Sequence, residues 1–227
     1  IFWKEISEAN EKKDFERGRS LYKKTSRFLF TFGAVLCGFF IPWINEIIRI
    51  LLGESYLEGA PVVMVMLLFA VFNSLAQVNI TFIYASSKTK THLVLGGICM
   101  IISIPLSYLF QAPKSFLIPG LELGSIGMAC KMLIMIVLRS NLIGWWLSRG
   151  MGWKFDWTYQ LISLSSSVFC GWVSFLVATK FLPEFMGHLV FKGVLAGIIY
   201  FLLVAYIMWM MPWLIGMDRK EIRGQIK

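Results

Sequence analysis

Six long apolar stretches limit what this chain can fold into more than any other feature of its sequence. Each is close to the roughly 20 residues that an α-helix needs to cross a bilayer. Backbone groups in lipid must be paired within their own segment, so such stretches fold as helices. The strict alternation of a membrane β-strand is absent. We predict spans at 28–52, 61–85, 93–111, 121–147, 159–182 and 189–215.

The composition agrees with a membrane protein. Hydrophobic residues make up 57% of the chain and charged residues 15%, whereas a soluble domain is roughly 45–50% apolar and about 25% charged. We therefore predict an all-α membrane protein, a bundle of six transmembrane helices. Its three parts would be a cytoplasmic helical connector over 1–27, the six-span bundle over 28–215 and a basic cytoplasmic tail over 216–227.

The placement of lysine and arginine predicts the orientation of the spans. Sixteen of these residues fall in the N-terminal segment, the second and fourth loops and the tail. The opposite loops carry only Lys114, with Lys180 and Lys192 near span ends. Positive residues mark the cytoplasmic side, so both ends of this segment are expected there, in the inner (cytoplasmic) membrane. The net charge of +9 then reflects topology and contact with anionic headgroups, and no nucleic-acid partner is expected.

The sequence contains no arrangement of residues that predicts catalysis. No hydrolase elbow, phosphate-binding loop, dinucleotide fingerprint or metal-ligand spacing appears, so we expect neither an enzyme nor a cofactor. The four cysteines lie inside apolar runs, which is typical of small packing residues. His92 and His188 fall at opposite membrane faces in this topology, and both are expected to be loop histidines. Proline bends helices, so Pro42 and Pro105 are expected to bend the first and third spans.

Two cations stand inside the fourth span. A charge at the bilayer centre costs at least ~2.5–3.5 kcal/mol, so it usually faces a cavity or a partner. Lys131 is far from both span ends, and it either lines an anion-attracting cavity or contacts a neighbouring carbonyl or hydroxyl. Arg139 is nearer the cytoplasmic end, where its stem can also reach the headgroups. Glu46 and Arg49 are one turn apart, and a local ion pair explains them.

Polar and small residues follow helical spacing in other spans. The second span places Asn73, Gln77, Thr81 and Tyr84 on one face, which either joins helices or lines a wet passage. Two small faces predict close helix packing. Their members are Ser163, Ser167, Gly171, Ser174 and Ala178 in the fifth span, and Gly193 and Gly197 in the sixth.

Four segments of the chain resemble a known family of membrane proteins. The first is a charged connector between spans, IFWKEISEANEKKDFERGRSLYKKTSRFL. The second, RILLGESYLEGAPVVMVMLLFAVFNSL, resembles a short turn of the form LFG-x-x-Y-x-x-A that leads into the next helix. The third is the loop NITFIYASSKTKTHLVLGG, where A-x-G-K-T-K is usual and Ser87 replaces a common glycine. The fourth, LELGSIGMACKMLI, is similar to a G-x-x-G-x-A start of a span, with Met128 and Ala129 after Gly127. The family is the polysaccharide flippases of the multidrug/oligosaccharidyl-lipid/polysaccharide exporter superfamily, and the resemblance covers roughly residues 1–147.

The resemblance implies a two-lobed transporter of twelve to fourteen spans, with a central cavity that opens alternately to either side of the membrane. This chain would then be the C-terminal part of a longer protein, and its partners would be membrane lipid and a missing N-terminal lobe. The implied substrate is an undecaprenyl-pyrophosphate-linked oligosaccharide, flipped for cell-surface polysaccharide biosynthesis. Lys131 and Arg139 would attract the pyrophosphate, and Asn73, Gln77 and Thr81 would contact sugars.

Two other classes of function stay open at this level. An ion-coupled multidrug exporter of the same superfamily would favour acidic cavity residues for its cationic substrates, whereas these spans carry basic ones. A non-transporting membrane scaffold would leave Lys131 and the polar face of the second span without a role. Within the flippase class, the sequence does not separate an oligosaccharide carrier from a lipid II carrier.

Overall fold

The computed structural model of the chain describes residues 2–12, 14–115, 118–150, 152–153, 155–181 and 189–216. The predicted basic tail over 216–227 lies outside these residues apart from Gly216, and so does His188.

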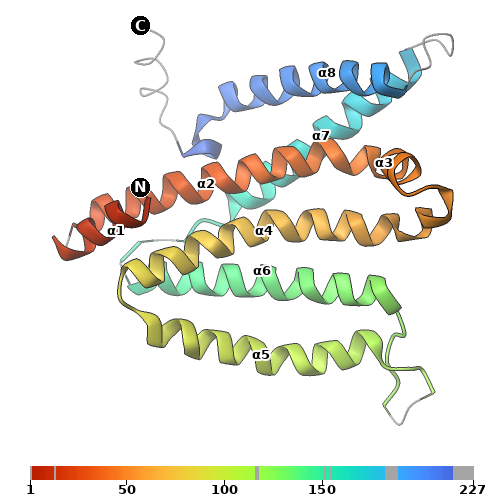
Figure 1. Ribbon diagram of the computed structural model, residues 1–227. Coiled ribbons are helices and arrows are strands. Elements are labelled where there is room, and N and C mark those ends of the chain that lie inside the picture. The colour runs from red at the N-terminus through yellow and green to blue at the C-terminus, as the bar shows by residue number, and fades with distance from the viewer. Residues whose placement is uncertain are drawn as a thin grey trace, which may run out of the picture. The chain divides into compact units, whose positions relative to one another are not determined.

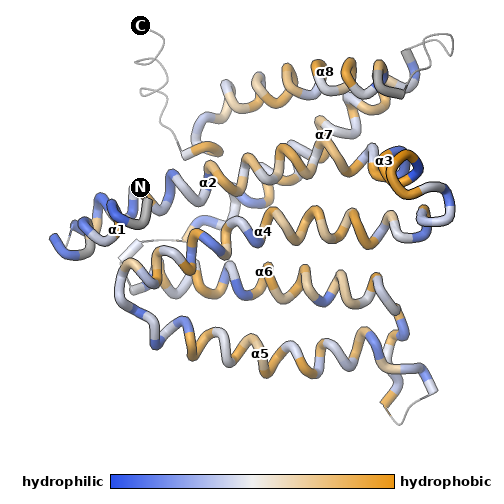
Figure 2. Tube along the Cα trace, viewed as in Figure 1, coloured by the Kyte–Doolittle hydropathy of each residue, from blue (hydrophilic) through white to orange (hydrophobic). Residues whose placement is uncertain are grey.

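The described residues are mostly helical and contain no strand (Figure 1). Six helical regions are long and apolar enough to cross a membrane: Phe15–Leu51, Glu54–Ala85, Thr89–Gln111, Gly124–Gly150, Thr158–Lys180 and Phe191–Met210. Figure 2 shows hydrophobic residues along these regions and hydrophilic ones at the N-terminal helix. The predicted all-α membrane fold with six spans is therefore confirmed.

The helical elements follow the predicted spans closely. The α-helices are α1 (Phe2–Glu11), α2 (Phe15–Phe40), α3 (Ile44–Leu51), α4 (Ala60–Ala85), α5 (Thr89–Gln111), α6 (Gly124–Gly150), α7 (Thr158–Phe181) and α8 (Leu189–Met210). The 3-10 segments are η1 (Ile41–Trp43), η2 (Glu54–Gly59) and η4 (Pro212–Ile215). The α-helix of the first span gives way to η1 at Pro42, as expected for a proline, whereas α5 continues through Pro105.

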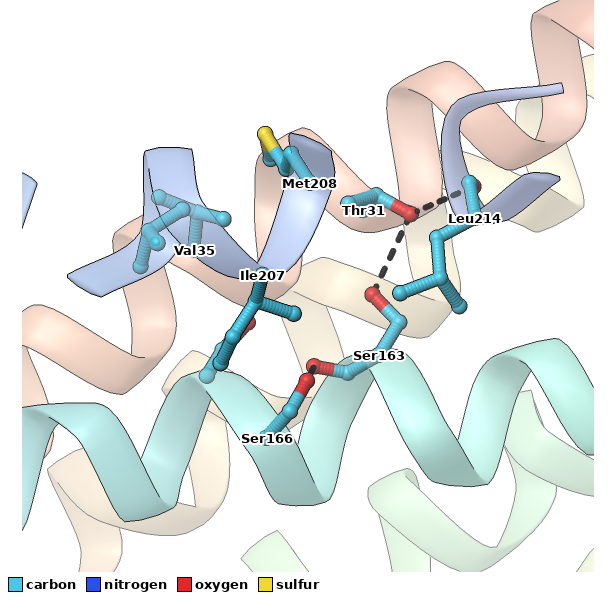
Figure 3. Close-up of a pocket in the computed structure, with 9 residues that line it drawn as sticks. Thr31, Val35, Ser163, Ser166, Ile207, Met208 and Leu214 are labelled. Atoms are coloured by element: carbon cyan, nitrogen blue, oxygen red, sulfur yellow. Dashed lines mark hydrogen bonds between the residues drawn. The ribbon is translucent and has the colours of Figure 1, made fainter. Parts of the chain in front are cut away.

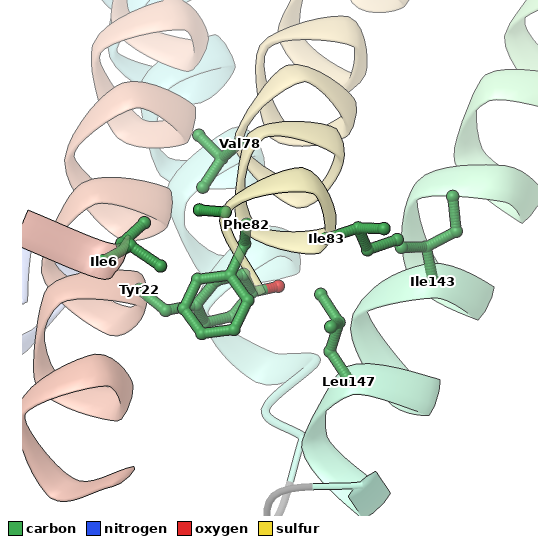
Figure 4. Packing of buried hydrophobic residues seen from close by; sticks show 8 residues of the cluster. Ile6, Tyr22, Val78, Phe82, Ile83, Ile143 and Leu147 are labelled. Atoms are coloured by element: carbon green, nitrogen blue, oxygen red, sulfur yellow. The ribbon is translucent and has the colours of Figure 1, made fainter. Parts of the chain in front are cut away.

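The chain divides into two compact units. Unit 1 comprises residues 1–26 and 61–156, and unit 2 comprises residues 27–60 and 157–227. In unit 1, α6 lies between α4 and α5 (Figure 1). The core of unit 1 joins α1, α2, α4 and α6 through eight buried residues (Figure 4). They are Ile6, Tyr22, Val78, Phe82, Ile83, Ala85, Ile143 and Leu147.

A buried polar contact crosses this apolar core. Asn79 is fully buried, accepts a hydrogen bond from Tyr22 Oη at 2.6 Å and donates one to the Ser140 carbonyl at 2.7 Å. The contact joins α2, α4 and α6, so it fixes their register as well as their spacing. Asn79 does not belong to the polar face predicted for this span, which begins at Asn73.

In unit 2, helices α2 and α7 approach closely through small residues. A Cβ added to Gly38 would lie 2.5 Å from the backbone carbonyl of Ser167, and one added to Gly171 would meet the Gly38 carbonyl oxygen. The predicted small face of the fifth span therefore packs as expected. The sixth span differs from its prediction, because a Cβ on Gly193 would have no described atom within 4 Å. Gly193 and Gly197 are thus not a close-packing pair among the described residues.

Arg27 is buried in unit 2, although the sequence placed it on a solvated connector. Only 6% of its surface is exposed. Its Nη1 donates to the Trp213 carbonyl at 2.7 Å, and its guanidinium lies 5.3 Å from the Tyr159 ring centroid and 5.4 Å from the Trp213 ring centroid. Thr31 donates to the Leu214 carbonyl and accepts from Ser163 Oγ (Figure 3). These contacts hold η4 against α2. The Trp213 carbonyl of η4 therefore pairs with a guanidinium that the sequence predicted to lie in the cytoplasmic connector.

Candidate functional site

The predicted site residues lie in unit 1, where residues of α4, α5 and α6 line an open hollow of about 490 Å³. This volume is within the range of roughly 300–1,000 Å³ that is typical of small-molecule sites. We call it the cationic hollow. Its lining residues are Phe69 and Asn73 from α4, Gly96, Cys99, Met100 and Ser103 from α5, and Lys131, Met132, Met135, Ile136 and Arg139 from α6.

Helical periodicity explains why each helix contributes the residues it does. Lys131, Met135 and Arg139 are four residues apart, so they follow one face of α6. The two cations are eight positions apart, which corresponds to a rise of about 12 Å along the helix axis. On α5 the lining residues recur at spacings of three and four, which also defines one face.

The two cations of the hollow have no protein counter-charge. Both side chains are half-buried. Among the described residues neither makes a side-chain hydrogen bond or an ion pair, and the hollow is lined by no aspartate or glutamate. Nε of Arg139 is buried and has no hydrogen-bond acceptor in the described part of the chain. Buried donors are nearly always paired in folded proteins, so this arrangement favours an anion or ordered water at the guanidinium.

The walls of the hollow are apolar and adaptable. Met100, Met132 and Met135 contribute thioether side chains with several rotatable bonds, which can follow the shape of different ligands. Asn73 and Ser103 add polar groups from α4 and α5. The hollow can therefore combine attraction for an anion with contacts to neutral polar groups.

The structure brings together three of the five predicted site residues. Lys131, Arg139 and Asn73 line the hollow. Gln77 is exposed and Thr81 half-buried, and neither lines it. The predicted polar face thus reaches the hollow only at its Asn73 end. At its other end, the Tyr84 ring meets the His92 ring of α5 at 5.3 Å between centroids.

The residues of α5 that line the hollow were not predicted from the sequence. Gly96, Cys99 and Ser103 are small or polar residues at helical spacing, and this spacing was the available signal. The predicted local pair near the end of the first span is confirmed, because Arg49 Nη1 lies 2.9 Å from Glu46 Oε2. That pair lies in unit 2 and takes no part in the hollow.

A family model described as MatE matches residues 6–109 of this chain, just under half of its length. The match supports a multi-pass membrane transporter of the multidrug/oligosaccharidyl-lipid/polysaccharide exporter superfamily. Members of the MatE family are transporters rather than enzymes, which supports the expectation of no catalytic activity. The matched region covers the α4 and α5 walls of the hollow and ends before α6, which carries both cations.

Comparison with curated proteins and with solved structures found no significant match. The family model therefore agrees with the superfamily that the sequence resembled and does not distinguish its flippase and multidrug branches.

Proposed function

We propose that this chain is part of a transporter that flips an undecaprenyl-pyrophosphate-linked oligosaccharide across the cytoplasmic membrane by alternating access. The product would serve cell-surface polysaccharide biosynthesis. The observation that carries the proposal is the cationic hollow, where Lys131 and Arg139 lie without a carboxylate among the described lining residues.

The electrostatics of the hollow favour a phosphate-bearing substrate. A charge pair interacts several times more strongly near the low-dielectric interior than in water. The guanidinium of Arg139 presents a planar set of donors that matches phosphate oxygens, while Lys131 acts as a point charge. Since the two cations are about 12 Å apart along α6, they would hold the pyrophosphate at successive depths. Asn73 would contact sugars, with Gln77 and Thr81 further along the same helix face.

The proposal includes partners that are not part of this chain. A second, N-terminal lobe would close the other side of the cavity, and the lipid tail would remain in the bilayer. The membrane would be the cytoplasmic one, with both ends of this segment on its inner side.

Replacing Lys131 tests the proposal in the full-length transporter. We expect Lys131→Ala to reduce surface polysaccharide at least about tenfold at unchanged protein level, because a charge-assisted contact is worth roughly 1.5–3 kcal/mol. Lys192→Ala is the matched control, because Lys192 is also a half-buried lysine of a spanning helix but does not line the hollow. Normal export by Lys131→Ala would contradict the proposal.

A multidrug exporter of the same superfamily is equally consistent with the MatE match. Its cationic substrates would be repelled by Lys131 and Arg139, so the charge of the hollow favours the flippase. Comparing the parent strain with a strain that lacks the transporter distinguishes the two functions. Loss of surface polysaccharide without a change in drug sensitivity on deletion of the transporter supports the flippase, and the reverse supports the exporter.

A further inference from the structure

A second group of cations lies at the end of unit 1 where α4 ends, α5 begins and α6 ends (Figure 1). Lys88 Nζ lies 5.5 Å from the Trp146 ring centroid, and the Arg149 guanidinium lies 4.9 Å from the Trp145 ring centroid. Both distances fall within the roughly 6 Å of a cation–π contact. We call these four residues the cation–tryptophan edge. None of them lines the cationic hollow.

The protein holds both cations of this edge in place. Trp146 packs against the buried core of unit 1, so the ring beneath Lys88 is anchored. Lys88 also approaches the last turn of α6, since a Cβ on Gly150 would lie 3.7 Å from its Nζ. Arg149 follows Trp145 by four residues, which stacks the two side chains on one face of α6.

The N–H donors of Lys88 and Arg149 are not taken up by other side chains among the described residues. Neither Lys88 nor Arg149 has a carboxylate at ion-pair distance or a side-chain hydrogen bond among the described residues. An indole face contacts a cation on one side and takes none of its N–H hydrogen bonds. Each cation is therefore positioned against an indole ring and still able to bind an anion.

The surroundings indicate that this anion is attached to a lipid. Trp145 is 41% exposed, and the first turns of α5 expose the apolar side chains of Leu93 and Val94. Tryptophan is enriched where spanning helices meet the headgroups, and basic groups between helices bind anionic lipid phosphates. A soluble phosphate would gain nothing from the apolar surface, whereas acyl chains would cover it.

We propose that the cation–tryptophan edge is a binding site for an anionic phospholipid of the bilayer. The phosphate contacts Lys88 and Arg149, and the acyl chains lie against Trp145 and the start of α5. The site is separate from the cationic hollow, and the proposal does not depend on the transported substrate.

Native mass spectrometry of the detergent-purified full chain tests the site, with cardiolipin or phosphatidylcholine added. We expect cardiolipin to bind more tightly than phosphatidylcholine, and Lys88→Gln with Arg149→Gln to weaken cardiolipin binding at least about tenfold. The matched control is Lys23→Gln with Lys90→Gln, which removes the same charge from two exposed lysines without a ring contact, and it should bind as the parent does. Lys88→Arg with Arg149→Lys keeps both charges and should retain binding.

Equal weakening in the control pair would show attraction by net charge alone and would overturn the site. Unchanged binding in the Lys88→Gln, Arg149→Gln variant would overturn it as well. Competition by sn-glycerol 3-phosphate at the cardiolipin concentration would show that a free phosphate suffices and would reject the lipid assignment. The export assay of the Lys131→Ala variant tests only the cationic hollow. Its outcome does not affect the lipid-binding test of Lys88 and Arg149.

Discussion

At the scale of single residues, two helices of unit 1 end in the same hydrogen-bonded turn, but a different residue type occupies its left-handed position. After α4, the Lys88 N–H bonds to the Ile83 carbonyl and the Ser87 N–H to the Tyr84 carbonyl. After α6, the backbone N–H groups of residues 153 and 152 bond to the carbonyls of residues 148 and 149. Both are Schellman motifs, which require a left-handed residue after the helix. Ser87 has φ +55° and Gly152 φ +76°.

Glycine adopts this conformation without the steric cost that a side chain adds. We therefore expect Ser87→Gly to stabilise the protein by roughly 0.5–1 kcal/mol, which thermal unfolding in detergent would detect as a Tm higher by a few degrees. The reciprocal change, Gly152→Ser, should lower Tm. A decrease in Tm for Ser87→Gly would contradict this account of the turn.

Asn79 shows how a single amide can join three helices. Its side chain accepts from Tyr22 and donates to the Ser140 carbonyl, and it is 0% exposed. Replacing it with leucine removes the Asn79 acceptor of the Tyr22 hydroxyl and the Asn79 donor to the Ser140 carbonyl, which lies inside α6. Removing one partner from a buried hydrogen bond costs roughly 1–3 kcal/mol.

We expect Asn79→Leu to lower the free energy of unfolding by about that amount. Adding Tyr22→Phe should recover part of the loss, since it removes the hydroxyl that has lost its Asn79 acceptor. Chemical unfolding of the two single variants and the double variant measures the coupling. Strict additivity would mean that the hydrogen bond contributes little.

At the scale of elements, the contact between α2 and α7 depends on glycines because backbone meets backbone there. Gly38 and Gly171 have no room for a methyl group, whereas Gly193 of α8 faces open space among the described residues. Two of these glycines therefore serve packing, and the third does not.

The contrast gives a matched pair of substitutions. Gly171→Ala should destabilise the protein by about 1–3 kcal/mol, because a well-packed contact must move apart. Gly193→Ala should be neutral or stabilising by up to about 1 kcal/mol through helix propensity. Tm in detergent compares them directly, and an equal loss in both variants would refute the packing difference.

At the scale of the whole molecule, the predicted orientation determines which end of each span meets the cytoplasm. It rests on the uneven distribution of lysine and arginine between the two sets of loops. Two exposed serines, Ser87 and Ser115, fall in loops on opposite sides in this topology and offer labelling positions.

We expect a cysteine at position 115 to react with a membrane-impermeant maleimide in intact cells. A cysteine at position 87 should react only after permeabilisation. The native cysteines lie within spanning helices, three of them buried, so the parent protein serves as the background control. Labelling of position 87 alone in intact cells would reverse the topology.

The sequence by itself determined the spans, the absence of strands among the described residues and the Glu46–Arg49 pair. These follow from local quantities: the transfer free energy of a stretch depends on its own composition, and an i,i+3 pair depends on helix geometry alone. The sequence also flagged Lys131 and Arg139, because a cation inside an apolar run is visible without a structure.

Only the tertiary structure decided which of these groups meet. It placed Asn73 in the same hollow as the two cations and left Gln77 outside that hollow. It also buried Arg27 against a carbonyl 186 residues away in the chain. The physical reason is that the partners of a side chain come from helices distant in sequence. Their packing faces depend on complementary shape, which the periodicity of one helix does not encode.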